Sequence, residues 1–164
     1  RLVLIGQGGK DDVEDGLVRL GKMMGYESAV IDHLPVLSDE PDQLITDLDY
    51  DLSRFPFLPT DSVVVLTKGE RDAETLEVLS RAGVRFVGLL ASMQRARDTL
   101  ATLRTRGVPE PFLQSVHTPI GLDIGAVSPE EICVAIMGDV TATKRGRHLP
   151  HGALASQAPP RVAT

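Results

Sequence analysis

The chain has 164 residues, 42% of them apolar, and a mean hydropathy close to zero, values typical of one globular domain. Its formal net charge of −6 argues against a nucleic-acid-binding surface, and its sequence has neither an apolar run as long as a membrane span nor a signal-peptide pattern. We therefore expect a cytoplasmic protein that binds neither nucleic acid nor membrane.

The N-terminal segment predicts a β-strand followed by an amphipathic helix. Residues 2–5 are all apolar, and the run stops at Gly6. Apolar residues then recur at helical spacing from Val13 to Met24, and Gly25 follows as a helix-ending residue. Because the chain begins directly in a strand, we expect a further segment before it.

A second strand is predicted over residues 28–31 and ends at Asp32. The segment 33–60 is rich in proline and acidic residues, which indicates a loop with at most a short strand near Leu44 and Ile45.

Alternating strands and helices continue after this loop. Residues 62–66 and 85–90 are predicted strands, and between them apolar residues around Leu76 form one face of a helix. A further helix runs from Met93 and stops before Gly107. Continuous apolar strands separated by helices are typical of a parallel sheet that is covered on both faces.

These elements predict an α/β fold, a Rossmann-like three-layer sandwich with a mainly parallel sheet. We assign this domain to residues 1–147. Residues 148–164 are rich in Pro, Ala and Gly without any period, so we expect a disordered tail.

The last helix has a strongly marked start. Ser128 is a good N-cap, Pro129 suits the first helical position, and Glu131 stands in capping-box register with Ser128. The linker before that helix carries Pro109 and Pro111.

The segment PIGLDIGA, which precedes this start, carries two glycines and an aspartate. Gly121 and Gly125 allow positive φ or a close backbone approach, while apolar side chains from Ile120 to Ile124 are expected to alternate inward. Asp123 would then point the opposite way, where it either caps neighbouring amides or contacts a ligand.

Ligands of parallel sheets bind beyond the carboxyl ends of the strands. Gly6 and Gly8, with Gly9 beside them, match the opening of a G-x-G-x-x-G phosphate turn, although a simple tight turn explains them equally well. The third glycine position is occupied by Asp11, whose carboxylate would compete with a phosphate. Asp32 stands where an acid would bind ribose hydroxyls, or it is a solvated strand-end residue.

Other candidate residues follow the later strands. Thr67 and Ser92 stand just after the third and fourth predicted main strands. His117 is either a packed residue or a ligand, and the four histidines show no metal-ligand spacing with each other or with Cys133. The lone Cys133 predicts a small buried side chain.

Two sequence elements carry a family resemblance. The elements VGLL-x-S and PIGLDIGA-x-SPEEI, within the run from Val63 to Val140, resemble the C-terminal domain of the xanthine dehydrogenase accessory protein family, XdhC/CoxI. The likeness extends through the Gly6 turn and Asp32. It implies that this chain is the Rossmann-fold half of a protein that holds the molybdenum cofactor (molybdopterin) and presents it for sulfuration and insertion. It also implies a molybdenum hydroxylase and a sulfurtransferase as partners, and a homodimer.

Three functions stay open: a cofactor-binding accessory factor, an NAD(P)-dependent oxidoreductase, and a dimerisation module with a vestigial site. An oxidoreductase needs a proton donor at the crevice, and we expect both Tyr26 and Tyr50 to be poorly placed for that role. No catalytic residue is assigned. The candidate binding residues, for molybdenum cofactor or NAD(P), are Gly6, Gly8, Gly9, Asp32, Thr67, Ser92 and Asp123.

Overall fold

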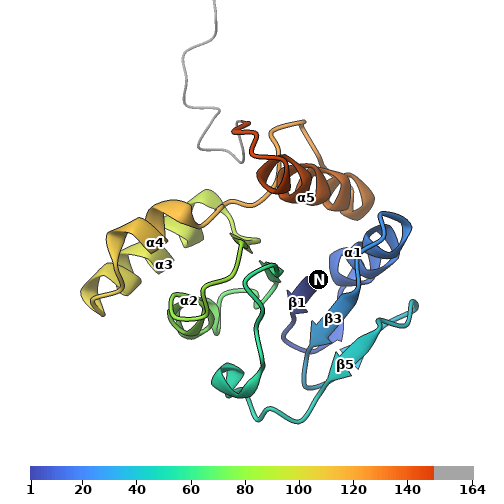
Figure 1. The fold of residues 1–164 in the computed structure, drawn as a ribbon, viewed down its shortest axis with the longest axis horizontal. Helices are drawn as coiled ribbons and strands as arrows, with labels where there is room; N and C mark the ends of the chain where they lie inside the picture. Colours follow the sequence, from blue (N-terminus) through green and yellow to red (C-terminus); the bar gives the residue numbers. More distant parts are fainter. Residues whose placement is uncertain (150–164) are drawn as a thin grey trace, which may run out of the picture.

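The computed structural model of the chain describes residues 1–149, and its centre is a five-stranded parallel sheet (Figure 1). The strand order is β5-β3-β1-β6-β7. The strands are β1 (Leu2–Ile5), β3 (Ser28–Ile31), β5 (Gln43–Ile45), β6 (Ser62–Val65) and β7 (Phe86–Leu89). Residues 150–164, most of the predicted tail, lie outside the described residues. The predicted Rossmann-type α/β fold is confirmed.

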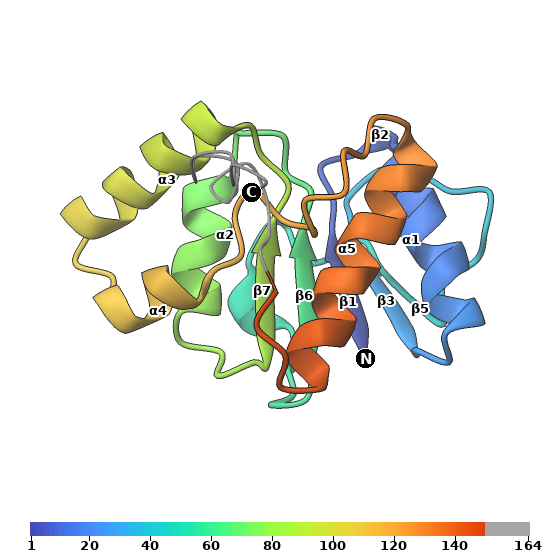
Figure 2. The same cartoon turned by 90° about the horizontal axis from the view of Figure 1, so that it is seen from above.

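Helices cover both faces of the sheet (Figures 1 and 2). One face packs against α1 (Asp12–Met23) and α5 (Pro129–Lys144). The other packs against the 3₁₀ turn η1 (Leu52–Arg54), α2 (Asp72–Leu79), α3 (Met93–Thr105) and α4 (Glu110–Ser115).

Side-chain alternation along each strand builds the two cores. In β1, Val3 and Ile5 belong to the core under α2 and α3, whereas Leu2 and Leu4 belong to the core under α1 and α5. Because both faces of the strand are buried, every residue in it must be apolar, which is why the sequence shows a continuous run.

The packing of α1 on α5 depends on two small residues. Gly16 leaves room for Cys133, since an added Cβ at position 16 would lie 2.7 Å from the Sγ atom. That thiol is buried and donates to the backbone oxygen of Val13 at 3.4 Å. Burial raises the pKa of Cys133 to about 11, so the thiol stays protonated, as suits the predicted buried residue.

Besides η1, three short elements were not predicted. β2 (Gly9–Lys10) and β4 (Pro35–Val36) form a small parallel ladder of their own beside the main sheet. The expected linker at Pro109 contains the six-residue helix α4, because proline is compatible with the start of a helix.

The segment PIGLDIGA crosses from the sheet to α5. His117 forms a single bridge with Gly88 of β7, and the chain then turns at Gly121, where φ is +102°. Ile120 is buried, but Ile124 is 54% exposed, so the predicted inward alternation is wrong beyond Leu122. It fails because the turn at position 121 breaks the extended geometry on which alternation depends.

A buried acid on α5 holds this segment. Asp139 is 2% exposed; its Oδ1 lies 2.8 Å from Nδ1 of His117, and its Oδ2 accepts the Gly121 N–H at 3.1 Å. The imidazole also packs on the ring of Phe86 at 4.7 Å between centroids. The histidine is therefore part of the packed structure between the sheet and α5.

Alanine at the two glycines of PIGLDIGA should have unequal effects. Both glycines have positive φ, which disfavours any Cβ, but only at Gly121 would the new Cβ also meet Ala135, at 3.2 Å. We expect Gly125→Ala to lose about 1 kcal/mol of unfolding free energy and Gly121→Ala roughly 2 to 3 kcal/mol. Urea melts of the two variants measure this, and equal losses would show that the approach to α5 is unimportant.

Candidate functional site

The carboxyl ends of β1, β3 and β6 meet at one edge of the sheet, as the sequence predicts for a parallel arrangement (Figure 2). A cavity of about 70 Å³ opens there, which we call the Asp32 cavity. Its walls come from the ends of these strands, from the loop between β5 and η1, and from the start of α2. They include Gly6, Asp32, His33, Tyr50, Thr67 and Arg71.

The buried carboxylate of Asp32 accepts a hydrogen bond from the backbone of the glycine turn. It is 4% exposed, and its two carboxylate oxygens accept the N–H groups of Gly8 at 2.8 Å and Leu34 at 3.0 Å. The N–H of Gly9 donates to the backbone oxygen of Leu34 at 2.8 Å. A phosphate on this turn would need those same amides, and two of them already have protein acceptors.

The N-terminus of α1 is also occupied by a carboxylate. Asp11 accepts the N–H groups of Val13 at 2.9 Å and Glu14 at 3.1 Å, and Lys68 pairs with it at 3.2 Å. This is the physical basis of the competition with phosphate that the sequence predicts at this position. A negative side chain satisfies the amides and the positive end of the helix dipole together.

Glu14, which sequence reasoning missed, lies directly beneath the turn. It is 1% exposed, and neither carboxyl oxygen has a hydrogen-bond partner within the described chain. Burial, with the nearby charges of Asp32 and Asp11, raises the pKa of Glu14 to about 8. The available signal was its position on the apolar face of α1, between Val13 and Leu17.

Gly6 separates these two acids. A Cβ at this position would lie 2.3 Å from Oδ2 of Asp32 and 2.4 Å from Oε1 of Glu14. No other residue fits between the carboxyl groups without moving one of them. Glycine is therefore needed at position 6 because two acids approach each other closely there. The motif predicts a different reason, contact with a phosphate.

Thr67 reaches the same cavity, whereas Ser92 does not. The buried hydroxyl of Thr67 donates to Asp72 at 2.6 Å, and Asp72 pairs with Arg95 at 2.9 Å. Ser92 is exposed and caps α3 by accepting the Arg95 N–H at 3.2 Å; it lines a neighbouring hollow beside Lys68.

Asp123 lies away from both hollows. Its side chain is exposed and makes no hydrogen bond within residues 1–149. The structure therefore brings Gly6, Asp32 and Thr67 together and leaves Asp123 apart from them. Capping of neighbouring amides, one of its two predicted roles, is not seen.

Tyr50 is placed differently from our expectation, because it lines the Asp32 cavity. Its ring centroid lies 4.8 Å from that of His33, and the guanidinium carbon of Arg71 lies 4.0 Å from the ring centre. Tyr50 has a φ of 63° and Asp49 a φ of 47°, a left-handed conformation that bulky residues rarely adopt. Such backbone outliers gather at functional sites.

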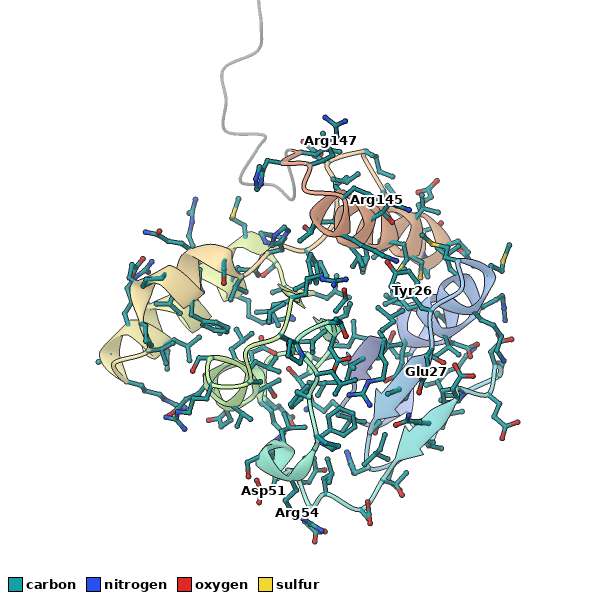
Figure 3. The ribbon with its side chains drawn as sticks, in the orientation of Figure 1. Tyr26, Glu27, Asp51, Arg54, Arg145 and Arg147 are labelled. Atoms are coloured by element: carbon teal, nitrogen blue, oxygen red, sulfur yellow. The ribbon has the colours of Figure 1, made fainter. Side chains whose placement is uncertain are left out.

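The other tyrosine lies elsewhere, as expected. Tyr26 precedes β3, and Lys144 of α5 lies 5.0 Å from its ring centre. Figure 3 shows Tyr26 beside α1 and α5, with Asp51 and Arg54 at the η1 turn that follows Tyr50.

The match with known proteins agrees with this fold. Residues 2–140 match the family described as the XdhC Rossmann domain. The chain belongs to this family. Among the described residues, no group of three His, Cys, Asp or Glu side chains is arranged to hold a metal ion. Nor does any helix described here have the length and apolarity needed to cross a membrane.

Three relatives are similar to this XdhC Rossmann domain over most of its length. A Bacillus subtilis protein, named as a probable xanthine dehydrogenase subunit, is 33% identical over 88% of this chain and 43% of its own. The Escherichia coli protein YqeB, described as uncharacterized, is 28% identical over 88% of this chain and 27% of its own. The crystal structure of a xanthine dehydrogenase from Bacillus halodurans superposes with a TM-score of 0.72 at 29% identity, covering 90% and 44% of the two chains. The chain thus spans less than half the length of each.

The burial of Glu14 predicts a dependence of stability on pH. Because the pKa of Glu14 is raised in the folded chain, the native state holds its proton more tightly than the unfolded state does. That contribution is fully present below pH 4.5 and is lost as the pH rises to about 8. We expect a loss of about 4 kcal/mol across this range in the parent, and no such loss in Glu14→Gln.

Urea melts at a series of pH values test this expectation. Glu130→Gln, which removes an exposed acid from α5, is the matched control and should follow the parent. If Glu14→Gln shows the same fall in unfolding free energy as the parent, Glu14 is not the group that takes up the proton.

Proposed function

We propose that this XdhC Rossmann domain is an accessory domain for molybdenum hydroxylases of the xanthine dehydrogenase type, and that it binds the molybdenum cofactor in the Asp32 cavity. The observation that carries the proposal is the family match over residues 2–140. The names of the relatives from the two Bacillus species, both given as xanthine dehydrogenase proteins, support it.

Several side chains of the Asp32 cavity have chemistry that suits part of this cofactor, although the cavity of about 70 Å³ has to widen to take it. The cofactor has a pterin ring system and a phosphate. Tyr50 and His33 offer aromatic surface to the ring, Asp49 offers a carboxylate to its N–H groups, and Arg71 offers a cation to the phosphate. The glycine turn fits less well, because Asp32 already accepts the Gly8 N–H.

The bound cofactor would supply the molybdenum chemistry, while this domain would bind and orient it. Asp32 and Thr67 are buried and form the polar floor of the cavity, and Asp72 fixes the Thr67 hydroxyl. Asp32 and Thr67 are fixed by hydrogen bonds to other residues, so they offer a ligand a rigid polar surface. We therefore favour a binding role over a catalytic one.

The geometry also bears on the oxidoreductase alternative. NAD(P) would place its diphosphate on the glycine turn and the start of α1, where Asp32 and Asp11 already accept the amides. Tyr50 and His33 are features that favour a catalyst, since a hydroxyl and an imidazole both belong to cavity-lining side chains. The occupied turn supports the accessory role over the oxidoreductase.

The family resemblance extends the proposal to partners. We include a molybdenum hydroxylase as the client, a sulfurtransferase as the source of sulfur, and a homodimer as the assembly, all in the cytoplasm. These assignments rest on the resemblance of PIGLDIGA-x-SPEEI and VGLL-x-S to the accessory family.

Cofactor retention tests the proposed function. Thr46 lines the cavity from its exposed side, so Thr46→Trp should block the cavity without removing a core contact. Protein purified from cells that make molybdenum cofactor is oxidised, and the fluorescent pterin released is measured. We expect the parent to carry pterin and Thr46→Trp to carry about ten-fold less.

The matched control is Thr60→Trp. Thr60 is also exposed, but it precedes β6 at the opposite edge of the sheet, so this variant should retain as much pterin as the parent. A parent without pterin, or equal retention by Thr46→Trp, would overturn cofactor binding at the Asp32 cavity.

A further inference from the structure

An open groove of about 740 Å³ runs between α1 and α5, which lie side by side on one face of the sheet (Figures 1 and 2). We call it the α1–α5 groove. Leu20 and Met24 from the end of α1 form one wall, residues of α5 between positions 134 and 145 form the floor, and Leu149 lies beyond α5. The groove shares no described lining residue with the Asp32 cavity, so it is a separate surface.

The groove exists because α5 has small residues there. Gly138 and Ala142 stand one helical turn apart, in line with Val134. Glycine is required at position 138, since an added Cβ would lie 2.8 Å from a methyl carbon of Leu122. Positions 134 to 145 span about 16 Å at 1.5 Å per residue, which is the length of three helical turns.

Apolar side chains along this groove are exposed. Val134 is 55% exposed, Leu149 49% and Met24 42%, whereas Met137 is buried beneath them. The hydroxyl of Thr141 already donates to the backbone oxygen of Met137, at 2.6 Å. Exposed apolar surface around a hollow is typical of a protein-binding face, and methionine side chains adapt to the shape of a partner.

The charges on the groove are positive. Arg145 and Arg147 line it, no Asp or Glu does so among the described residues, and neither arginine makes an ion pair within 4.0 Å inside residues 1–149. Figure 3 shows both arginines beside α5. This surface contrasts with the net charge of −6 of the whole chain. The dipole of α5 explains a cation at its C-terminal end, but it does not explain the exposed apolar side chains beside that cation.

The shape and the charge of the groove select its occupant. A groove between two helices accepts a third helix whose apolar residues recur at helical spacing. A second copy of the same groove would bring arginines against arginines. Residues 150–164 contain no Asp or Glu, so this segment of the chain lacks the complementary charge. A lipid surface has no ridge that would fill a hollow.

We propose that the α1–α5 groove is the docking site for an amphipathic helix of a partner protein, with acidic residues along the flank of its apolar face. The apolar residues of that helix pack between Met24 and Val134, and its carboxylates pair with Arg145 and Arg147. This interaction needs no cofactor, so it stands or falls separately from ligand binding at the Asp32 cavity.

A designed peptide provides the test. The probe is a fluorescent helix of Ala, Leu and Glu, with leucines on one face and glutamates beside them. A scrambled peptide of the same composition and a peptide with Lys in place of Glu are its two comparisons. We expect fluorescence anisotropy to show that the parent binds the acidic helix about ten-fold more tightly than either comparison.

Val134→Gln removes an apolar contact from the groove and should weaken binding of the acidic helix about five-fold. Val127→Gln is the matched control, because Val127 is 84% exposed and lies outside the groove, before α5. It should bind the acidic helix as the parent does.

Replacing both Arg145 and Arg147 by Glu should reverse the preference, so that the basic helix binds more tightly than the acidic one. Loss of folding cannot produce such a gain. The matched control replaces Arg85 and Arg97 by Glu, since both are exposed, lie outside the groove and give the same change in net charge. This control should keep the preference for the acidic helix.

Equal affinity of the parent for the three peptides would overturn the proposal, and so would a preference that survives both groove variants. A homodimer at micromolar concentration that Val134→Gln dissociates would assign the groove to a second copy instead. Equally strong competition by a peptide of residues 150–164 would assign it to the chain itself. Binding to phosphatidylglycerol vesicles without any peptide preference would assign it to a membrane surface.

Discussion

The carboxyl edge of the sheet is organised by one buried carboxylate, that of Asp32. By accepting the amides of Gly8 and Leu34, it fixes the glycine turn to the loop after β3 and forms one wall of the cavity. Its charge also contributes to the raised pKa of Glu14 on the other side of Gly6. The position of the turn and one wall of the cavity thus follow from the same two hydrogen bonds, and the buried Glu14 lies beside them.

The arrangement shows that a Rossmann frame and an anion-binding turn are separable properties. The frame follows from apolar strands and their crossover helices, and it is complete in this chain. Anion binding needs amides without acceptors. Here the carboxylates of Asp32 and Asp11 already accept hydrogen bonds from those amides. A glycine motif alone therefore says that the backbone turns tightly, and the acids around it determine what the turn can bind.

Much of the fold follows from the sequence because burial on both faces leaves a direct mark, a continuous apolar run, on each main strand. The strands predicted at 62–66 and 85–90 lie at 62–65 and 86–89 in the structure. The ladder of β2 and β4 has two residues in each strand and no apolar pattern. Pairing of this kind depends on the Asp32 contacts that bring the two loops together, which no local signal reveals.

The site was harder to predict because its main members act through distant partners. Asp32 was found from its place at a strand end, but its acceptor role depends on Gly8, far away in the sequence. Glu14 and Asp139 look like ordinary helix acids until their burial is known. Tyr50 belongs to a segment without regular pattern, and only its left-handed backbone and ring contacts bring it to the cavity.

The contact between α1 and α5 also has a consequence for the order of folding during synthesis. Of the helices described here, α1 leaves the ribosome first, but the partner for its buried face, including Cys133, is α5, the last of them. Until that helix emerges, the face that carries Leu17 remains uncovered. The unit of β1 and α1 therefore cannot complete its core early, and the nascent chain exposes an apolar helix face that is open to chaperones while residues 24–128 of this domain are translated.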